Sequence, residues 1–376
     1  MKTKLIKLIY VSFISALFFL IIALSLEIFF RFSGKYPLAG FQLNDNDLWR
    51  IEKSIHENKE TEEGTSFILT IAPNGFRGPL PSPEKTKAIK RILILGDSYT
   101  AGLGYPDHQI FTSIFSDLLN NDSSLHQKFE IINTGIPAWS IDQEWKYFIE
   151  EGINFHPDYV LIVASPNDIR EAYCKKFVTL DAHDSLVVHP PHFILKKKLG
   201  WYLSAHSSLF LYLQKKVFHS NYGTMSDLFE MYPLNFGKEE QRDWDRPLYL
   251  KNPFKEVLDA QKLYEKLLSG IQQKCLTDKI PFGVCLNVVL TQFDSTYAND
   301  SACDVHVVGN YFSSLTNQLN IPFLNSGNPA SWLTYNPKEL FMQNDYHYSA
   351  KGHLFVAKEL YDFFKRDILL KPDTLK

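Results

Sequence analysis

From Arg91 onwards, short apolar runs alternate with helical hydrophobic patterns, except over about 172–250. The helical patterns repeat apolar residues every three or four positions, as one buried helix face requires. Apolar strands separated by such helices predict an α/β fold, a three-layer α/β/α sandwich whose parallel central sheet is covered on both faces. The runs predict strands at 92–95, 129–132, 159–164, 282–289 and 321–324, and helices at 111–119, 145–149, 254–271, 308–319 and 354–364.

The N-terminus has a different pattern, because its apolar residues are continuous and leave no polar face. Residues 8–26 contain no charged side chain, and the apolar run resumes after Glu27. A membrane-spanning helix needs about 20 apolar residues, so this run is long enough. Lys2, Lys4 and Lys7 precede it. The positive-inside rule therefore predicts a single-pass membrane protein with a cytoplasmic N-terminus and a periplasmic or extracellular main domain.

Two other interpretations of this run stay open. Ala23 and Ser25 form a weak small-x-small site, which is compatible with a cleaved signal peptide. A core helix of a soluble domain is the second alternative, although such a helix usually carries one polar face.

These patterns predict three consecutive regions. Residues 1–31 form the cytoplasmic tip and membrane anchor, 32–88 an irregular polar linker rich in Glu, Lys and Pro, and 89–368 the main domain. Residues 172–250 interrupt the strand–helix rhythm with an aromatic run and a lysine cluster. We expect an inserted cap beside the active site there, with a surface elaboration and a membrane-facing patch as alternatives.

Composition and charge exclude several classes of function. The net charge of −3 comes without a basic stripe, which argues against a nucleic-acid partner. The four cysteines have no C-x-x-C spacing, so a zinc site is not predicted, although one disulfide stays open. His189 and His192 have no carboxylate or thiol at usual ligand spacing, and we predict no metal.

The first chemical motif is Gly96-Asp97-Ser98, which directly follows the first predicted strand. Ligands of open parallel sheets bind beyond the carboxyl ends of the strands, and a serine on this turn would lie there. Its own backbone N–H would face the same edge and could stabilise an oxyanion. An ordinary turn explains the motif equally well when it is taken alone.

A nucleophilic serine needs a base, and Asp345-Tyr346-His347 lies just before the last predicted helix. His347 could accept the serine proton while Asp345 orients the imidazole and stabilises its charged form. Three alternatives are less favourable, since none combines an adjacent acid with a position that opens the last helix. They are the pair Asp304 and His306, the pair Asp181 and His183, and His353.

Two further strand ends carry hydrogen-bond donors. Asn133-Thr134-Gly135 ends the second predicted strand and Asn167-Asp168 the third. The Gly135 backbone N–H and the Asn167 amide, with the Ser98 N–H, could form an oxyanion hole, in which each donor is worth about 3 kcal/mol of barrier.

The order of these motifs resembles the four blocks of the SGNH/GDSL hydrolase family, named after its Ser, Gly, Asn and His. The resemblance implies a flavodoxin-like fold, Ser98 as nucleophile, His347 as base, Gly135 and Asn167 as oxyanion donors, supporting roles for Asp97 and Asp168, and no cofactor. Asn74-Gly75-Phe76-Arg77 also looks like an element that precedes the Gly-Asp-Ser strand in bacterial membrane-anchored members.

Three departures from the family pattern concern the same site. Ser165 stands where the third block usually has Gly, and Asn344 stands at the usual position of the acid, three residues before the His. Asp345, two residues before it, then takes the role of acid, a spacing seen in acetyltransferase-like branches. Trp139 in the second block is expected to pack rather than to line the substrate site.

The resemblance therefore implies an esterase that cleaves an acyl ester, such as an O-acetyl group on an envelope glycan or lipid. An O-acyltransferase of envelope polysaccharide is the alternative within enzymes, because a sugar hydroxyl could replace water. A non-catalytic glycan-binding or scaffold protein on a degenerate fold is the alternative outside them. The sequence does not specify the oligomeric state.

Overall fold

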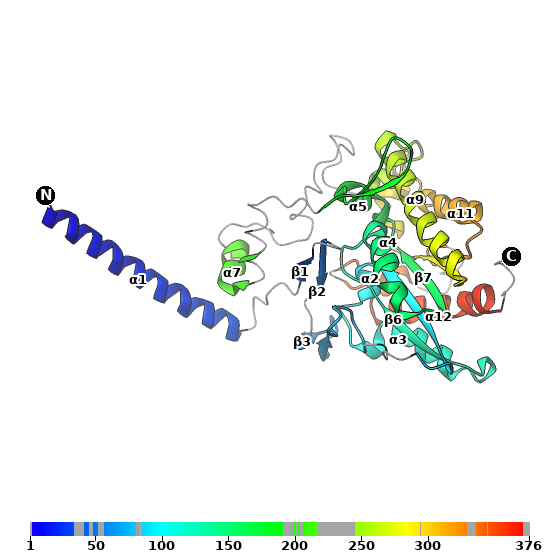
Figure 1. Ribbon diagram of the computed structural model, residues 1–376, viewed down its shortest axis with the longest axis horizontal. Helices are drawn as coiled ribbons and strands as arrows, with labels where there is room; N and C mark the ends of the chain where they lie inside the picture. The colour runs from blue at the N-terminus through cyan, green and yellow to red at the C-terminus, as the bar shows by residue number, and fades with distance from the viewer. Residues whose placement is uncertain are drawn as a thin grey trace. The chain divides into compact units, whose positions relative to one another are not determined.

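The computed structural model describes residues 2–33, 41–44, 48–51, 56–79, 81, 85–190, 199, 202–203, 206–216, 245–293, 295–328, 336–343 and 345–370. The chain divides into two compact units, each of which is described by itself (Figure 1). The smaller unit combines Met1–Phe41 with His192–Tyr232. The larger unit combines Gln42–Pro191 with Pro233–Lys376.

A five-stranded sheet forms the centre of the larger unit. Its spatial order is β11-β10-β7-β5-β6, and every neighbouring pair is parallel. The middle strands are buried nearly throughout, as their unbroken apolar sequences require when helices cover both faces. All five predicted strands are confirmed, as β5 (Ile89–Gly96), β6 (Lys128–Asn133), β7 (Tyr159–Ala164), β10 (Phe282–Leu286) and β11 (Phe323–Asn325).

Helices cover the two faces of this sheet, so the predicted α/β/α layering is confirmed. One face carries α3 (Phe111–Asn121) and α12 (Ala350–Phe363), which pack together. The other carries α4 (Ile141–Glu150), α5 (Asn167–Lys175) and α9 (Lys255–Asp278). Tyr264 of α9 meets Phe312 of α11 (Val307–Gln318) edge to face, with ring centroids 5.2 Å apart.

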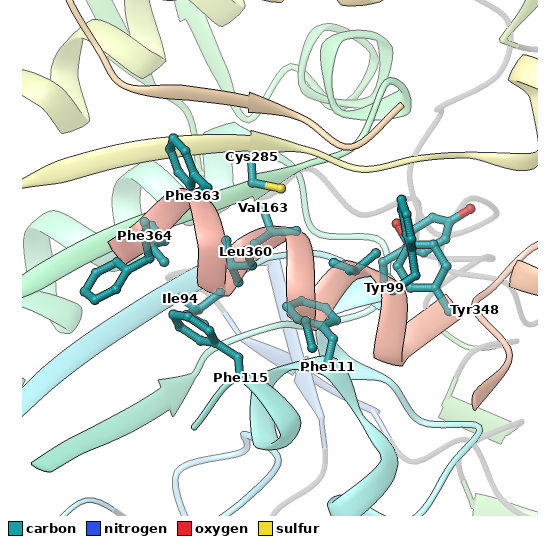
Figure 2. Packing of buried hydrophobic residues seen from close by; sticks show 14 of the residues in the cluster. Ile94, Tyr99, Phe111, Phe115, Val163, Cys285, Tyr348, Leu360, Phe363 and Phe364 are labelled. Carbon is teal, nitrogen blue, oxygen red and sulfur yellow. The ribbon is translucent and has the colours of Figure 1, made fainter. Parts of the chain in front are cut away.

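The main core lies between the sheet and the α3–α12 layer. Figure 2 shows Phe111 and Phe115 of α3 beside Leu360 and Phe363 of α12 and Phe364, which directly follows it. Burying one such side chain is worth about 1.5–3 kcal/mol. The same cluster continues to Tyr99 and Tyr348, whose ring centroids are 4.7 Å apart. The core therefore extends to the carboxyl edge of the sheet, where the chemical motifs lie.

Shorter elements connect the layers. They comprise α2 (Ser98–Ala101), α10 (Ser295–Asn299), the antiparallel hairpin β8 (Val178–Leu180) with β9 (Leu186–Val188), a π-helix (Phe364–Leu369), and 3-10 turns at Asp107–Gln109, Ser123–Leu125, Gly152–Phe155, Arg246–Tyr249, Leu290–Phe293 and Pro337–Leu340.

The prediction that the linker at 32–88 is irregular is wrong, because this region contains strands. It contains two small sheets, one of β1 (Phe41–Asn44) and β2 (Leu48–Ile51), the other of β3 (His56–Glu60) and β4 (Ser66–Thr70). Several of its apolar side chains, among them Trp49, Leu69 and Phe76, are buried, whereas Ile68 is exposed. Charged residues surround them in the sequence and hid the strands, yet the linker belongs to the larger unit from Gln42 onwards.

The smaller unit contains α1 (Lys2–Ser33) and α7 (Ser208–Lys216), which contact each other. Residues Ile9–Ser33 form a helix long and apolar enough to cross a membrane, and none of its most apolar window is buried. Such a helix also fits a signal sequence. Of the predicted insertion, α7 thus belongs with α1, while residues 191–198 and 217–244 lie outside the described residues. The cap stays a prediction.

All four cysteines are buried thiols. Cys285, in the middle of β10, is fully enclosed, as its apolar surroundings predict. The disulfide left open by the sequence is not formed.

Candidate active site

The carboxyl end of β5 turns sharply into α2, and Ser98 is the first residue of that helix. The Asp97 carboxylate accepts the Tyr99 N–H at 2.9 Å and so caps the turn. Gly96 has to be a glycine, since a Cβ there would lie 2.2 Å from the Thr100 hydroxyl oxygen. Among the described residues, the Ser98 N–H has no hydrogen-bond acceptor, so it is available to a ligand.

Ser98, His347 and Asp345 are brought together as the sequence predicts. His347 Nε2 lies 2.7 Å from Ser98 Oγ, and His347 Nδ1 lies 2.7 Å from Asp345 Oδ1. The same Asp345 oxygen accepts the His347 backbone N–H at 3.1 Å. The turn that pairs acid and base is thus closed within three residues, which explains how an acid two positions before the histidine reaches the ring.

Asp345 is a charged, partly exposed acid. Its side chain is 44% exposed, and its hydrogen bond to His347 lowers the pKa of Asp345 below the ordinary value. An ionised carboxylate on Nδ1 fixes the tautomer in which Nε2 faces Ser98 and can accept its proton. Asn344, the residue at the family's usual acid position, lies outside the described residues.

Aromatic side chains hold the histidine loop against the serine turn. Tyr99 donates its hydroxyl to the Tyr346 carbonyl at 2.9 Å, and its ring centroid lies 5.1 Å from that of His347. Tyr346 itself is 62% exposed beside His347. Its ring therefore borders the open side of the site, where a substrate would enter.

The two predicted oxyanion donors differ in availability. The Gly135 N–H already donates to the Asn133 side-chain oxygen at 2.9 Å, so an oxyanion would have to share it. A Cβ at Gly135 would lie 2.4 Å from the Ala101 nitrogen, so the glycine permits close packing on α2. Asn167 opens α5, and its amide donates one hydrogen to Glu171 at 3.1 Å. Its second amide hydrogen remains for a ligand.

Ser165 joins a chain of hydrogen bonds between the two sides of the site. The Tyr348 hydroxyl donates to the Asn287 side-chain oxygen at 2.9 Å, and the Asn287 amide donates to Ser165 Oγ at 3.0 Å. The Ser165 hydroxyl in turn hydrogen-bonds the Asp97 carboxylate. This chain, which we call the serine relay, links the neighbour of His347 to the neighbour of Ser98. A glycine at 165 could not form it.

Buried acids lie behind the serine relay. Asp168 accepts the Ser165 N–H at 2.7 Å. Burial raises the pKa of Asp97 to about 6 and raises the pKa values of Asp168 and Glu144 well above their ordinary values. Neither carboxylate oxygen of Glu144 has a hydrogen-bond partner among the described residues. Asp97 and Asp168, predicted as supporting residues, are thus buried structural acids beside the site.

Arg77, in the Gly-Phe-Arg element, anchors the segment that follows Ser98. Its buried guanidinium donates to the carbonyls of Gly102 and Tyr105 and pairs with Asp107 at 2.8 Å. Both carbonyls lie in the turn that follows α2, and the Gly102 carbonyl also accepts the Tyr105 N–H at 3.4 Å. The sequence pointed to this element only through the resemblance, without giving its role.

The rival histidines have other surroundings. His353 is buried in the core and accepts the Phe111 N–H, and burial lowers its pKa to about 3. Asp304 and Asp181 bind the backbone N–H of His306 and His183 rather than the rings. His189 bonds Thr179, and His192 lies outside the described residues. Within the described ranges, no group of three or more His, Cys, Asp or Glu could hold a metal ion.

Trp139 is fully buried and packs edge-on against Phe76 of the linker. Its indole N–H donates to the Trp49 carbonyl at 2.9 Å, and Trp49 donates to the Pro137 carbonyl. It therefore packs the linker onto the second block instead of lining the substrate side.

No family model and no curated protein matches the chain. Solved structures with a similar arrangement include Axe2, an acetylxylan esterase from Geobacillus stearothermophilus, at 14% identity and a TM-score of 0.40, covering 73% of this chain and 93% of that one. TesA is 10% identical, with a TM-score of 0.41, covering 73% and 98% of the two chains. A lipase/acylhydrolase from Enterococcus faecalis is 12% identical, with a TM-score of 0.39, covering 74% and 97%. Similarity this low does not assign an activity to this chain. An activity has to be inferred from the side chains of its own site.

Proposed function

We propose that the protein is a serine esterase of the SGNH/GDSL type that cleaves acyl esters, with Ser98 as nucleophile, His347 as general base and Asp345 as the acid that orients it. The observation that carries the proposal is the continuous pair of 2.7 Å contacts from Ser98 Oγ through the imidazole to Asp345. Such a chain of nucleophile, base and orienting acid is the geometry that activates a serine hydroxyl.

In this mechanism Ser98 Oγ attacks the ester carbonyl and its proton moves to His347 Nε2. The tetrahedral oxyanion accepts hydrogen bonds from the Ser98 N–H and the Asn167 amide, with Gly135 as a shared third donor. Collapse breaks the bond to the alcohol, which leaves with the proton from His347. Water then attacks the acyl-serine with His347 as base, and the carboxylic acid and free Ser98 are released. No cofactor takes part in any step.

The substrate class follows from the anchor and the chemistry together. The Ile9–Ser33 part of α1 has the length of a membrane span, and the lysines before this part favour a cytoplasmic N-terminus. The esterase would then work in the periplasm or outside the cell, on O-acyl groups of an envelope glycan or on a lipid ester.

The test is turnover of p-nitrophenyl acetate by the detergent-purified full chain. Ser98→Ala and His347→Ala should each lower kcat/KM by about 10³-fold or more, since members of such a unit fail together. His306→Ala is the matched control, because Asp304 and His306 repeat the same acid-x-His spacing on an exposed turn. Equal turnover by parent and Ser98→Ala would refute the proposal.

Hydrolysis and transfer are separated by the acceptor. With an O-acetylated oligosaccharide as donor, we expect acetate release to exceed acetyl transfer to an added unacetylated oligosaccharide. Predominant transfer would reassign the protein as an O-acyltransferase with the same Ser98 intermediate.

A further inference from the structure

Glu27 interrupts the apolar face of α1 and binds the beginning of α7. Its two carboxylate oxygens accept the Ser207 hydroxyl at 2.8 Å and the backbone N–H groups of Ser208 and Leu209 at 3.1 and 2.9 Å. The first N–H groups of a helix have no partner within the helix, and a carboxylate there satisfies them. The charge within the apolar run is therefore explained by a helix from a segment about 180 residues later in the sequence.

Further contacts continue this pairing along one side of α1. Phe30 stacks on Tyr212 with ring centroids 4.5 Å apart, and Arg31 donates to the His206 carbonyl at 2.6 Å. Among the α1 residues whose exposure is described, only Ala23, Glu27 and Phe30 are partly covered. Their spacing of four and three residues marks a single helix face. The rest of α1 remains free to contact lipid.

The position of Glu27 along α1 determines the depth of α7 in the bilayer. A helix rises about 1.5 Å per residue, so the uncharged run 8–26 fills roughly the 30 Å hydrocarbon core. Glu27 and Arg31 then lie at its outer boundary, among the lipid head groups. The start of α7 lies at the same depth, because its N–H groups bond the Glu27 carboxylate and the preceding His206 carbonyl bonds Arg31.

The composition of α7 and of the residues before it suits that level. α7 reads Ser-Leu-Phe-Leu-Tyr-Leu-Gln-Lys-Lys, so apolar and aromatic residues precede two terminal lysines. Leu209 through Leu213 are partly exposed, and Leu199 and Tyr202 upstream are exposed. Aromatic residues and lysines are enriched where hydrocarbon meets head groups, and interfacial helices bury such apolar side chains in lipid.

We propose that α7, together with Leu199 and Tyr202 before it, forms a second membrane contact, lying in the head-group layer of the outer leaflet beside α1. This inference rests on the proposed membrane span. The partner is the lipid surface itself. The larger unit is joined to the smaller one at three places in the chain, near residues 41, 191 and 232, so the insertion as well as the anchor tethers the catalytic unit to the bilayer.

The test is depth-dependent fluorescence quenching of the full chain in vesicles of phosphatidylcholine and phosphatidylglycerol. Single cysteines are introduced as Phe210→Cys on α7, Leu17→Cys in the middle of α1 and Lys255→Cys, which is 83% exposed on α9. The native cysteines are buried, so a thiol-reactive fluorophore should label the introduced positions, with the parent chain as the control for labelling. Nitroxide lipids carry the quencher either at the head group or near the bilayer midplane.

We expect the probe at 17 to be quenched most by the midplane nitroxide and the probe at 210 most by the head-group nitroxide, about 10 Å or more nearer the surface. Quenching at 17 without quenching at 210 would overturn the second contact while leaving the span. Absence of quenching at 17 would instead remove the span on which it rests. Strong midplane quenching at 210 would place α7 in the hydrocarbon core and also overturn the interfacial assignment.

A second variant tests the contact that positions α7. Glu27→Ala removes the acceptor of the three hydrogen bonds from Ser207, Ser208 and Leu209, and the probe at 210 should lose its head-group preference while the probe at 17 keeps its depth. Glu27→Gln keeps an acceptor oxygen and should retain more of that preference. An unchanged profile at 210 in Glu27→Ala would show that this contact does not position the helix.

Discussion

Two groups of carboxylates surround Ser98, and their surroundings give them opposite properties. Asp345 is on a partly exposed loop, where the hydrogen bond to His347 keeps its pKa low. Asp168 and Glu144 are fully buried, and loss of hydration keeps their pKa values high. Environments that separate the pKa values of neighbouring acids separate their roles. In the proposed mechanism the exposed acid supplies charge to the base, whereas burial disfavours ionisation of the acids behind it.

Asp345→Asn should have the largest effect that this comparison predicts. Asparagine keeps the size of the side chain but removes the charge and can hold the wrong imidazole tautomer, so kcat should fall by about 10³-fold. Esterase kinetics measure the loss of activity, and thermal unfolding measures any loss of stability. Since the Asp345 side chain is partly exposed, the stability of the variant should change little. A loss of activity below tenfold would remove Asp345 from the role of acid.

The low pKa of Asp345 also has a pH consequence with a definite sign. An acid whose folded pKa is depressed contributes stability above its unfolded pKa, and the contribution is lost as pH falls through the folded pKa. An ordinary aspartate becomes half protonated near about pH 4. Because the pKa of Asp345 is lower, its ion pair with His347 should persist somewhat below that pH.

Arg77→Lys should have the next largest effect. Lysine keeps the charge but cannot reproduce the planar fork that reaches the carbonyls of Gly102 and Tyr105. Each buried carbonyl left without a donor costs about 1–3 kcal/mol. The free energy of unfolding should fall by several kcal/mol, and kcat should fall with it because α2 carries Ser98. Arg366→Lys is a suitable control, since the Arg366 side chain is 67% exposed and pairs with the neighbouring Asp367.

Tyr348→Phe tests the serine relay. The change leaves the Asn287 oxygen without its donor and loosens the tyrosine beside His347, so kcat should fall by about tenfold with KM nearly unchanged. Tyr361→Phe, which removes a hydroxyl of the following helix α12 that is bonded to Asp122, is the matched control. Ser165→Gly should resemble Tyr348→Phe, and Ser165→Thr should retain most activity. A common loss of stability without a specific loss of kcat would make the relay purely structural.

Glu144→Gln should have the smallest effect on catalysis and a distinctive effect on stability. A buried acid with a raised pKa binds its proton more tightly in the folded state, so stability falls as pH rises from the unfolded pKa towards the folded one. Glutamine carries no charge to bury, so the variant should unfold at the parental temperature near about pH 4 and several degrees higher near about pH 9. Greater stability of the parent at alkaline pH would show that Glu144 is ionised and paired.

Much of this fold could be predicted from the sequence because its signals are local. The strands and their covering helices follow from hydrophobic runs, and parallel strands bring Ser98, Gly135 and Asn167 to one edge. The Asp345–His347 pair is itself local, closed within three residues. Ser98 and His347 are 249 positions apart, so no local pattern predicts their contact. The order of the motifs along the chain suggested it.

The missed features depend on contacts between distant segments. The strands of the linker were hidden by charge, although Trp49 and Phe76 are buried. The relay joins Tyr348, Asn287 and Ser165 from three separate segments, and no periodicity marks it. The partner of Glu27 lies in α7, so the sequence showed an interruption of the apolar run without its reason.

The most direct measurement of the central claim is covalent trapping with a fluorophosphonate, followed by mass spectrometry of the labelled peptide. A phosphonate on Ser98 in the full-length parent, with labelling lost in Ser98→Ala and slowed about 10³-fold in His347→Ala, is the predicted result. Circular dichroism should show both variants folded. Phosphonate on another residue, or equal labelling of the parent and His347→Ala, would contradict activation of Ser98 by His347.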